Sequence, residues 1–375
     1  MRKIILDCRF LNPCNAGLAR YTSELLYHFN SLAPKDWQFF LLVFEKDREY
    51  LRGLDRERFK QVFVKEKWYS FGEQLSLAKT IYGLKPDLVH FFNDNHPIAL
   101  QLPFVLTIHD LTRLFYSSGL KSLLKRPFLK VVLRSGLSHA RKIIAISETT
   151  KSEILGNFTV APEKITVIYN GLSLWGSKGT LLEKAKTEVG KLSGGVPYLL
   201  YVGQLRPHKN LLRLIEAFAI FRRAFPDKTP LKLLLVGKKS PFLQKILRLA
   251  ERLGVENEVV AIGFVDDVTL LALYSQAAAF ILPSLNEGFG LPPLEALAMG
   301  VPVAASDLPV FREILGRGAY YFDPFSAQAI ALAIKKITTS KSLREEILRY
   351  GRRQLQKYDW QNTAAKTLDV YREAL

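Results

Sequence analysis

The chain has 375 residues, of which 48% are hydrophobic and 23% are charged, and its formal net charge is +18 at pH 7. The length predicts two domains, and the composition is typical of globular proteins, which excludes a disordered or low-complexity chain. The charge favours a polyanionic partner, namely nucleic acid, an anionic membrane surface or a phosphorylated ligand. Because the excess is spread evenly over both halves of the sequence, it argues against a dedicated nucleic-acid-binding arm.

The N-terminal segment MRKIILDCRF has no signal-peptide pattern, and no apolar run in the sequence is long enough to span a bilayer. Cys8 and Cys14 are the only cysteines, and no histidine accompanies them, so neither a disulfide framework nor a metal site is expected there. We therefore expect a cytoplasmic protein.

The first half of the chain alternates short apolar runs with amphipathic segments, which predicts a parallel sheet with crossover helices. A helix is expected to begin near Gly17. The expected strands cover residues 3–6, 37–44, 88–92, 103–108, 142–146 and 165–169. Residues 173–196, which are rich in Gly, Ser and Lys, are typical of a linker.

A second alternating series follows the predicted linker. Its expected strands cover residues 198–202, 231–236, 258–262, 278–282, 302–305 and 319–322. The tail after residue 340 has a helical pattern that breaks near Tyr358. The sequence thus predicts an α/β protein with two Rossmann-like domains, residues 1–172 and 197–357. Open sheets of this kind bind ligands outside the carboxyl ends of their strands.

The segment YVGQLRPHKN, residues 201–210, follows an expected strand and opens an expected helix. Arg206, His208 and Lys209 approach the N-terminus of that helix, where cations are unfavourable unless an anion lies between them. Two interpretations stay open, a phosphate-binding turn and a solvated basic turn. In the first half, VLTIHDL places His109 directly after a strand, and AGLARY places Gly17 in a strand-to-helix loop.

The stretch PSLNEGFGLPPLEALAMGVP, residues 283–302, is the most informative part of the sequence. Pro292 and Pro293 predict a helix start, which places Glu287 in the preceding loop and Glu295 in the first helical turn. Glycines between the two acids leave backbone amides uncovered at a helix N-terminus, an arrangement that suits phosphate. A polyhydroxylated ligand that carries phosphate, such as a nucleotide sugar, fits this combination.

The string EGFGLPPLEA resembles the E-x7-E signature of family 4 of the retaining glycosyltransferases. Residues 201–210 are similar to the phosphate-binding turn of that family. TIHD, which contains His109, is similar to its T-x-HD element, and GLARY is similar to its G-x-G-R-Y loop, with Ala19 in place of the second glycine. The resemblance covers nearly the whole chain. It implies a GT-B fold, in which two Rossmann-like domains face each other across a cleft and the C-terminal helix, 358–375, crosses back to the N-terminal domain.

The resemblance also implies roles for individual residues. Lys209 is expected to contact the leaving diphosphate, Glu287 to hold a sugar hydroxyl, and Glu295 to hold the ribose. Gln204 stands where many members have arginine, so we expect Arg206 to supply the second positive charge. The expected catalytic residues are His109, Glu287 and Lys209, and the expected donor-binding residues are Gly17, Arg206, Lys209, Val265, Gly288, Phe289, Gly290, Leu291 and Glu295.

The expected reaction is transfer of a hexose with retention, mannose being favoured, from a GDP- or UDP-sugar to a glycan or lipid-linked acceptor. No Asp-x-Asp motif is present, and Asn93-Asp94-Asn95 is the nearest approach, so neither a metal nor another cofactor is expected. A sugar-nucleotide epimerase of the same fold and a basic nucleic-acid-binding protein are the alternatives, although no nucleic-acid-binding motif is found.

Residues 119–142 mix leucines with Lys121, Lys125, Arg126, Lys130 and Arg134, and Pro127 is expected to interrupt them. One interpretation is a basic amphipathic stretch that lies on an anionic membrane surface, which would place the protein peripherally on the inner face of the cell membrane. The other is an ordinary helix with a solvated basic face.

Overall fold

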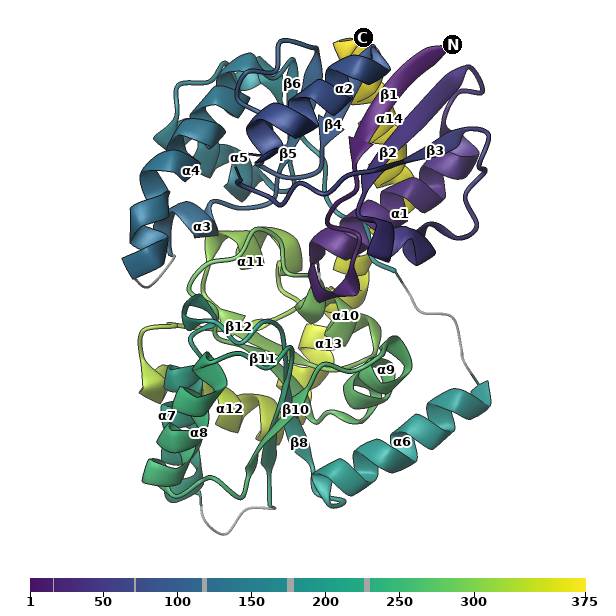
Figure 1. Cartoon of the computed structure of the whole chain (residues 1–375). Coiled ribbons are helices and arrows are strands. Elements are labelled where there is room, and N and C mark those ends of the chain that lie inside the picture. Colours follow the sequence, from purple (N-terminus) through teal and green to yellow (C-terminus); the bar gives the residue numbers. More distant parts are fainter. Residues whose placement is uncertain (16, 71, 117–119, 174–178, 226–229) are drawn as a thin grey trace. The chain divides into compact units, whose positions relative to one another are not determined.

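The computed structural model describes residues 1–15, 17–70, 72–116, 120–173, 179–225 and 230–375. The chain divides into two compact units. The first comprises Met1–Gly171 and Tyr358–Leu375, and the second comprises Leu172–Lys357. Each unit is a parallel sheet with helices packed against it (Figure 1).

The sheet of the first unit has the described strand order β3-β2-β1-β4-β5-β6-β7, and every pairing is parallel. Its central strands are mostly apolar because helices cover both faces, and β5 is buried along its whole length. The strands are β1 (Arg2–Asp7), β2 (Trp37–Val43), β3 (Phe59–Phe63), β4 (Leu88–Phe91), β5 (Phe104–Ile108), β6 (Lys142–Ala145) and β7 (Ile165–Val167).

Two hydrophobic cores lie on opposite faces of this sheet. On one face, α1 (Gly17–Leu32) and α14 (Trp360–Ala374) pack over β1 and β2. Figure 1 shows α14, in yellow, beside α1 in purple. The other face is covered by α2 (Ala78–Leu84), α4 (Leu120–His139) and α5 (Glu148–Asn157). Short elements complete the unit: η1 (Pro13–Asn15), η2 (Glu45–Leu51), the π-helical η3 (Glu73–Leu77), α3 (Thr112–Phe115) and η4 (Pro162–Lys164).

The C-terminal helix α14 is bonded to the first sheet through a buried polar chain. The His90 ring lies 2.5 Å from the hydroxyl of Tyr371 through Nδ1 and 2.8 Å from Thr107 Oγ1 through Nε2. Both His90 and Tyr371 are fully buried, and burial lowers the pKa of His90. These contacts make α14 part of the core of the first unit.

The sheet of the second unit has the described order β10-β9-β8-β11-β12-β13, again with parallel pairings. The strands are β8 (Tyr198–Val202), β9 (Lys232–Val236), β10 (Val259–Gly263), β11 (Ala279–Leu282), β12 (Val303–Ser306) and β13 (Tyr320–Phe322). The helices are α6 (Gly179–Ser193), α7 (Leu211–Ala224), α8 (Phe242–Leu253), α9 (Asp267–Gln276), α10 (Leu291–Ala298), α11 (Pro309–Leu315), α12 (Ala327–Thr339) and α13 (Lys341–Leu355), with η5 (Pro207–Lys209).

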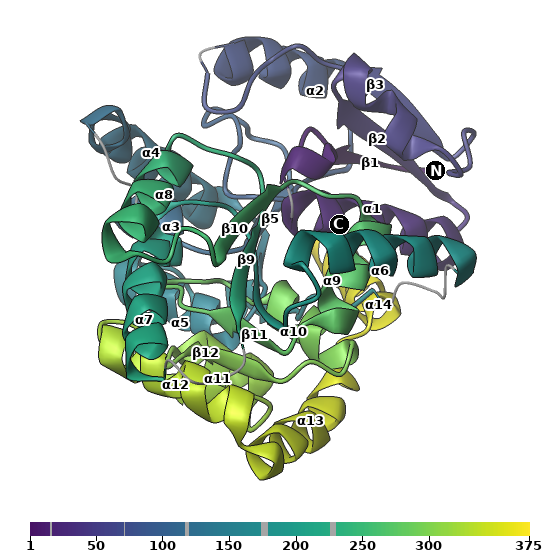
Figure 2. The same cartoon turned by 90° about the horizontal axis from the view of Figure 1, so that it is seen from below.

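The predicted linker over 173–196 is wrong in its central part. Residues 179–193 form α6, which packs against α9 within the second unit, and the Gln276 side chain donates to the carbonyl of Lys186 (3.0 Å) (Figure 2). The sequence TLLEKAKTEV has helical periodicity that the surrounding Gly, Ser and Lys residues obscure. Residues 174–178 of the predicted linker lie outside the described part of the chain.

Two further expectations need correction. Strand β3 was not predicted, because its sequence FKQVF has only Phe59 buried at the edge of the sheet and lacks the apolar run of the central strands. Pro127 does not interrupt the helix over 119–142, since α4 continues through it from Leu120 to His139. Gly119 lies outside the described residues, as do the side chains of Lys121 and Lys125. The break near Tyr358 is confirmed between α13 and α14.

Candidate functional site

The strand order of the second unit identifies the place where a ligand is expected. The connections from β8 lead to β9 on one side, whereas β11 lies on its other side, so the winding of the sheet reverses between β8 and β11. Doubly wound sheets bind ligands outside the carboxyl ends of the strands at this switch point. The loop 203–210 follows β8, and the loop 283–290 follows β11. The two segments that the sequence analysis selected therefore flank the switch point.

These two loops are bonded to each other. The backbone N–H of Leu285 donates to the carbonyl of His208 (2.8 Å), and Lys209 Nζ lies 2.5 Å from Glu287 Oε1. The hydroxyl of Ser284 also donates to Glu287 Oε1 (2.8 Å). The Lys209 and Glu287 side chains are 14% and 16% exposed, so this ion pair is partly shielded but still reachable from solvent. The structure brings together two residues that are 78 positions apart in the sequence.

The hydrogen bonds of Glu287 are distributed unevenly over its carboxylate. Both Lys209 and Ser284 bond to the same oxygen, Oε1. A carboxylate has about four lone-pair sites, so Oε2 keeps the capacity to accept hydrogen bonds from a ligand. The negative charge of Glu287 also contributes to a raised pKa of the Tyr201 hydroxyl, although burial of Tyr201 is the larger cause.

The backbone of the loop after β8 has a special conformation that fixes Lys209. Asn210 adopts a left-handed conformation (φ 59°) at the start of α7, and its side-chain amide donates to the carbonyl of Pro324 (2.7 Å). Asparagine is one of the few residues that tolerate this conformation. At the end of β9, Gly237 has φ +158° and lies so close to the carbonyl oxygen of Gly203 that a Cβ atom would stand 1.9 Å from it. Glycine is thus required at position 237 so that the segments that follow β8 and β9 can lie this close together.

The predicted helix start at Pro292 and Pro293 is confirmed, since α10 begins at Leu291 with proline in its first turn. Gly290 precedes it with φ +105°, and a Cβ atom there would meet the Phe311 ring at 3.0 Å. The backbone at Gly288 and Gly290 is buried, and the Phe289 side chain is in the core, 4% exposed. Any contact of Phe289 with a ligand would therefore use its backbone.

Glu295 lies just beyond the first helical turn in which it was predicted. Because α10 begins at Leu291, Glu295 is in the second turn. It is buried, and the hydroxyl of Tyr274 donates to its Oε2 (2.9 Å). Tyr274 comes from α9 and is itself fully buried. This hydrogen bond fixes the orientation of the carboxylate.

The two remaining predicted residues of the second unit lie in loops. Arg206 is exposed and precedes η5, and its carbonyl accepts a hydrogen bond from the N–H of Lys209 (3.0 Å). Val265 is half-buried between β10 and α9, next to Phe264, which is exposed. Among the described residues, no hydrogen bond or ion pair joins Val265 to the Lys209–Glu287 pair.

The predicted residues of the first unit follow its strands β1 and β5. His109 comes directly after β5, and its Nε2 lies 2.8 Å from the carbonyl oxygen of Phe92. Because a carbonyl only accepts, Nε2 carries the proton, and burial lowers the pKa of His109, so the ring is neutral with Nδ1 as an acceptor. The ring edge packs on Tyr21 (4.8 Å between centroids).

Gly17 is the first residue of α1 and is exposed. A Cβ atom at this position would meet no protein atom within 4 Å, so the packing of the described residues does not itself require glycine. The preceding Ala16, which the sequence analysis included in the same loop, lies outside the described residues. Cys8 is a free, buried thiol whose pKa burial raises.

The first unit also contains a buried charge cluster that the sequence analysis did not detect. Arg9 bonds to both carboxylate oxygens of Asp7 (2.8 and 2.7 Å) and to Glu73 Oε1 (2.6 Å), and all three side chains are inaccessible to solvent. The side-chain amide of Asn95 also donates to Glu73. Burial raises the pKa of Glu73, and Arg9 opposes that shift. No sequence motif indicates this cluster, because its members belong to three separate segments.

Ser284 and Tyr274 were also missed as partners of the two glutamates. Ser284 stands inside the informative string, three residues before Glu287, so its spacing was available as a signal. Tyr274 stands in an ordinary helical segment and gives no signal of its own. Among the described residues, no group of three or more His, Cys, Asp and Glu side chains is placed to hold a metal ion. Within the same residues, no helix has both the length and the apolarity to cross a membrane.

The two doubly wound sheets place the protein in the GT-B class of α/β folds. It superposes on sucrose-phosphate synthase from Thermosynechococcus elongatus with a TM-score of 0.78 and 19% identity over 99% of this chain and 98% of that one. The Anabaena protein Alr3699/HepE in complex with UDP-glucose gives a TM-score of 0.78 and 18% identity over the whole of both chains.

Sequence comparisons define the family. Residues 183–354 match the family described as glycosyl transferases group 1, and residues 16–174 match Glycosyltransferase Family 4. The O-antigen chain mannosyltransferase RfbU of Salmonella typhimurium is 30% identical over 295 residues, which are 79% of this chain and 76% of that protein. This identity shows that the chain belongs to the glycosyltransferase family that RfbU and the two matched models define.

Proposed function

We propose that this glycosyltransferase transfers mannose, with retention and without a metal ion, from a nucleotide-diphosphate sugar to a glycan or lipid-linked acceptor. The observation that carries this proposal is the Lys209–Glu287 pair at the switch point of the second sheet. It sets one cation and one carboxylate side by side where a doubly wound sheet receives its ligand. A diphosphate next to a hydroxylated sugar has the complementary groups.

Lys209 is assigned to the diphosphate. Its ammonium group is partly shielded from water, which strengthens its interaction with a phosphate oxygen. The charge that develops on the leaving diphosphate would be met by Lys209, by Arg206 and by backbone N–H groups near Gly288 and Gly290. These groups would take the part that a divalent ion plays in other transferases.

Glu287 is assigned to a hydroxyl of the donor sugar. Its Oε1 already accepts from Lys209 and Ser284, and both bonds withdraw electron density from the carboxylate. That environment disfavours a covalent nucleophile, whereas Oε2 is suited to accept from a sugar hydroxyl. The pattern supports a front-face displacement, in which the departing phosphate takes the proton of the acceptor hydroxyl.

Glu295 is assigned to the ribose and His109 to the sugar pocket. Tyr274 holds one oxygen of Glu295, so the carboxylate has a fixed direction in which to meet a hydroxyl pair. A neutral His109 with a free lone pair on Nδ1 is suited to accept a hydrogen bond from a sugar hydroxyl. Val265, Gly17 and Leu291 are proposed to line the donor through backbone and apolar contacts.

The preference for mannose rests on relatives, and GDP is proposed as its carrier from the family resemblance alone. RfbU, which is 30% identical to this chain, is named a mannosyltransferase. HepE, whose structure contains UDP-glucose, is only 18% identical to this chain. Calorimetric titration with GDP-mannose and UDP-glucose in the presence of EDTA tests donor and metal dependence together. We expect GDP-mannose to bind in EDTA. Binding that requires added Mg²⁺ would contradict the metal-free mechanism. Tighter binding of UDP-glucose than of GDP-mannose would contradict the proposal that GDP-mannose is the donor.

The acceptor proposal rests on α4. Its outer face exposes Phe128 and Val131 together with Lys130 and Arg134. Apolar and basic side chains on one helical face are suited to the interface of an anionic membrane, where a lipid-linked acceptor would lie. Sedimentation with phosphatidylglycerol vesicles at low and high salt tests this. A variant with Phe128→Ser and Val131→Ser should lose binding, and equal binding by the variant would contradict the role of α4.

A further inference from the structure

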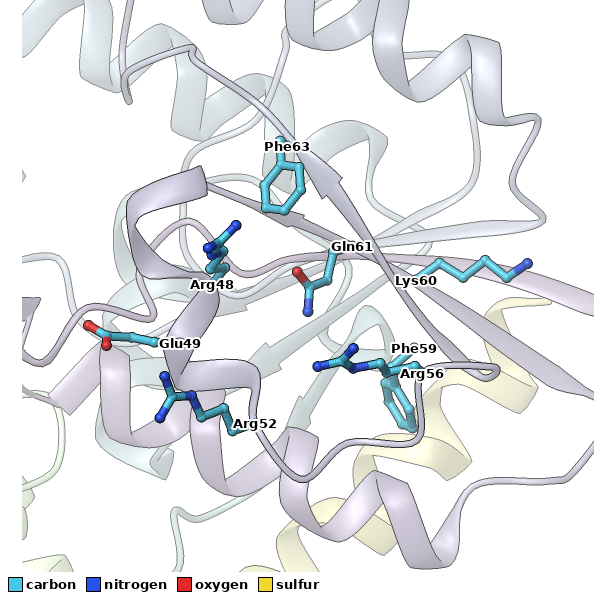
Figure 3. Close-up of a pocket in the computed structure, with 8 residues that line it drawn as sticks. All are labelled: Arg48, Glu49, Arg52, Arg56, Phe59, Lys60, Gln61 and Phe63. Atoms are coloured by element: carbon cyan, nitrogen blue, oxygen red, sulfur yellow. The ribbon is translucent and has the colours of Figure 1, made fainter.

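A second charged site lies in the first unit, beside the edge strand β3. It is an open pocket of about 630 Å³ between η2 and β3 (Figure 3). Phe59 forms a fixed part of its wall, since it is buried and stacks on Phe39 with 4.9 Å between ring centroids. The lining residues are Arg48, Glu49, Arg52, Arg56, Phe59, Lys60, Gln61 and Phe63.

Most of the basic side chains of this pocket lie around its opening, and its acidic side chain does not. Figure 3 shows that Arg48, Arg52 and Arg56 surround the opening with the amide of Gln61 between them. Lys60 extends to the other side of β3, as the alternation of side chains along a strand requires, and Glu49 points away. Among the described residues, none of the three arginine side chains has an ion-pair partner.

The scaffold under the arginines is held in place by buried contacts. Asp47 in η2 is 2% exposed and accepts a hydrogen bond from the side chain of Asn12 (2.7 Å), which turns its neighbour Arg48 outward. In the connection to β3, the guanidinium of Arg58 donates to the carbonyls of Ala33 (2.9 Å) and Pro34 (3.0 Å). Three arginines of this segment therefore meet at one opening, while Glu49 also belongs to the lining but points away.

The free edge of the sheet adds backbone donors next to the pocket. The carbonyl of Arg58 accepts from Phe39 and the N–H of Val64 donates to Val43, so even-numbered residues of β3 pair with β2. In a parallel ladder the alternate residues face the other way, which directs the N–H groups of Gln61 and Phe63 to the free edge. The Phe63 ring is 49% exposed at the end of the strand.

We propose that this arginine pocket, formed by Arg48, Arg52, Arg56 and Gln61, binds a phosphate-type oxyanion, a diphosphate or a phosphodiester. Guanidinium groups form paired hydrogen bonds with such oxyanions, and three of them around one opening match a ligand with several charged oxygens. Phe63 provides an apolar surface for the group that carries the phosphate. This site belongs to the first unit and shares no residue with the proposed donor site.

Charges beside an edge strand also prevent pairing with other chains. A charge that serves only this purpose needs neither a pocket nor a saturable ligand. The two explanations differ in one measurement, which is specific binding of a phosphate probe to the segment 45–63.

The test uses the full chain, inorganic pyrophosphate and a triple variant, Arg48→Gln, Arg52→Gln and Arg56→Gln. Glutamine keeps a polar side chain at each exposed position, and the single variant Arg52→Gln serves if the triple variant has a lowered Tm. The matched control removes three exposed cations from α8, by Lys245→Gln, Arg248→Gln and Arg252→Gln. Calorimetry at low salt gives the affinity, and hydrogen exchange of peptides from 45–63 and from 203–210 locates the ligand.

We expect pyrophosphate to protect the 45–63 peptides in the wild type and in the α8 variant. In the triple variant the affinity at this site should fall about tenfold or more, with protection of the 203–210 peptides retained. A parallel arm uses phosphatidylglycerol vesicles, and sedimentation that the triple variant alone loses would identify a lipid headgroup as the source of the phosphate. If neither probe distinguishes the triple variant from the α8 variant, the arginine pocket is not a ligand site.

Discussion

Two ion-pair arrangements in this protein each join a basic side chain to carboxylates, but they differ in their exposure to solvent. In the Lys209–Glu287 pair of the second unit, the two side chains are 14% and 16% exposed. Lys209 and Ser284 both bond to the same oxygen of Glu287, Oε1. The Asp7–Arg9–Glu73 cluster of the first unit is inaccessible to solvent, and both oxygens of Asp7 bond to Arg9.

The difference indicates which group of charges serves a ligand. A closed cluster has its bonding capacity filled by the protein, so removing one member leaves a buried charge without a partner. Removing one member of a partly exposed pair, in which one carboxylate oxygen has no protein partner among the described residues, should change the stability of the fold little. We therefore expect substitutions in the first cluster to change stability and substitutions in the second pair to change activity.

The largest expected effect is that of Arg9→Met. It leaves Asp7 and Glu73 buried without their counter-charge and should lower the free energy of unfolding of the first unit by about 3–5 kcal/mol. Denaturant titration followed by circular dichroism measures the loss. A matched change on the surface, Arg56→Met, should cost about 0.5 kcal/mol or less. If Arg9→Met cost no more than this control, the cluster would not be structural.

Lys209→Ala comes next and tests the open pair. Loss of one donor to the leaving diphosphate should lower kcat by about 10²–10³, while the melting temperature changes little. The measurement is the initial rate of mannosyl transfer from GDP-mannose, with Lys245→Ala as the control. Near-normal turnover with the alanine variant would remove Lys209 from the mechanism.

Glu295→Gln tests the deeper acid of the second unit. The amide oxygen can still accept from Tyr274, but a neutral group binds a ribose hydroxyl less well than a carboxylate. Replacing a charge-assisted hydrogen bond should weaken nucleotide binding by about 1.5–3 kcal/mol, with a smaller effect on kcat. Calorimetry with free GDP measures it. Unchanged affinity would contradict the ribose assignment.

The stability of the first unit is also expected to depend on pH. Burial, with a smaller contribution from His139, lowers the pKa of His96 to about 4. Between about pH 6.5 and 4 the unfolded chain binds more protons at this histidine than the folded one, so stability falls as the pH falls through that window. The loss amounts to at most about 1.4 kcal/mol per pH unit.

His96→Phe should therefore flatten the pH dependence of the unfolding free energy between pH 6.5 and 4. The ring of His96 already stacks on Phe104, so an aromatic replacement keeps that packing. Equal slopes for the variant and the wild type would show that His96 does not contribute.

The sequence predicted every described strand except β3, which lies at one edge of the first sheet. Strand β9, with the buried run LLLV, is apolar on both faces and is recognised by composition alone. Strand β3 is largely exposed, and its polar residues Lys60 and Gln61 interrupt the apolar run by which a strand is recognised in a sequence. Helix α6 was missed because the glycine- and lysine-rich residues before it resemble a linker.

For the candidate site, the sequence selected Glu287 and Lys209 but did not predict that they pair. Both residues stood out through their motifs, yet their contact depends on β8 and β11 being neighbours, which no local pattern encodes. Tyr274 and the arginine pocket carry no motif, because burial and the clustering of charges appear only after folding. Glu295 was placed in the first turn of α10 and lies in the second, since the helix begins one residue before the first proline.

The position of α14 has a consequence for how the protein is made. The hydroxyl of Tyr371 reaches His90 in the middle of the first sheet, so the first unit lacks one of its core helices until residues 360–374 have been translated. Residues 172–357 are translated in between and are free to fold sooner. A nascent chain stalled before residue 358 would expose the apolar surface that α14 covers.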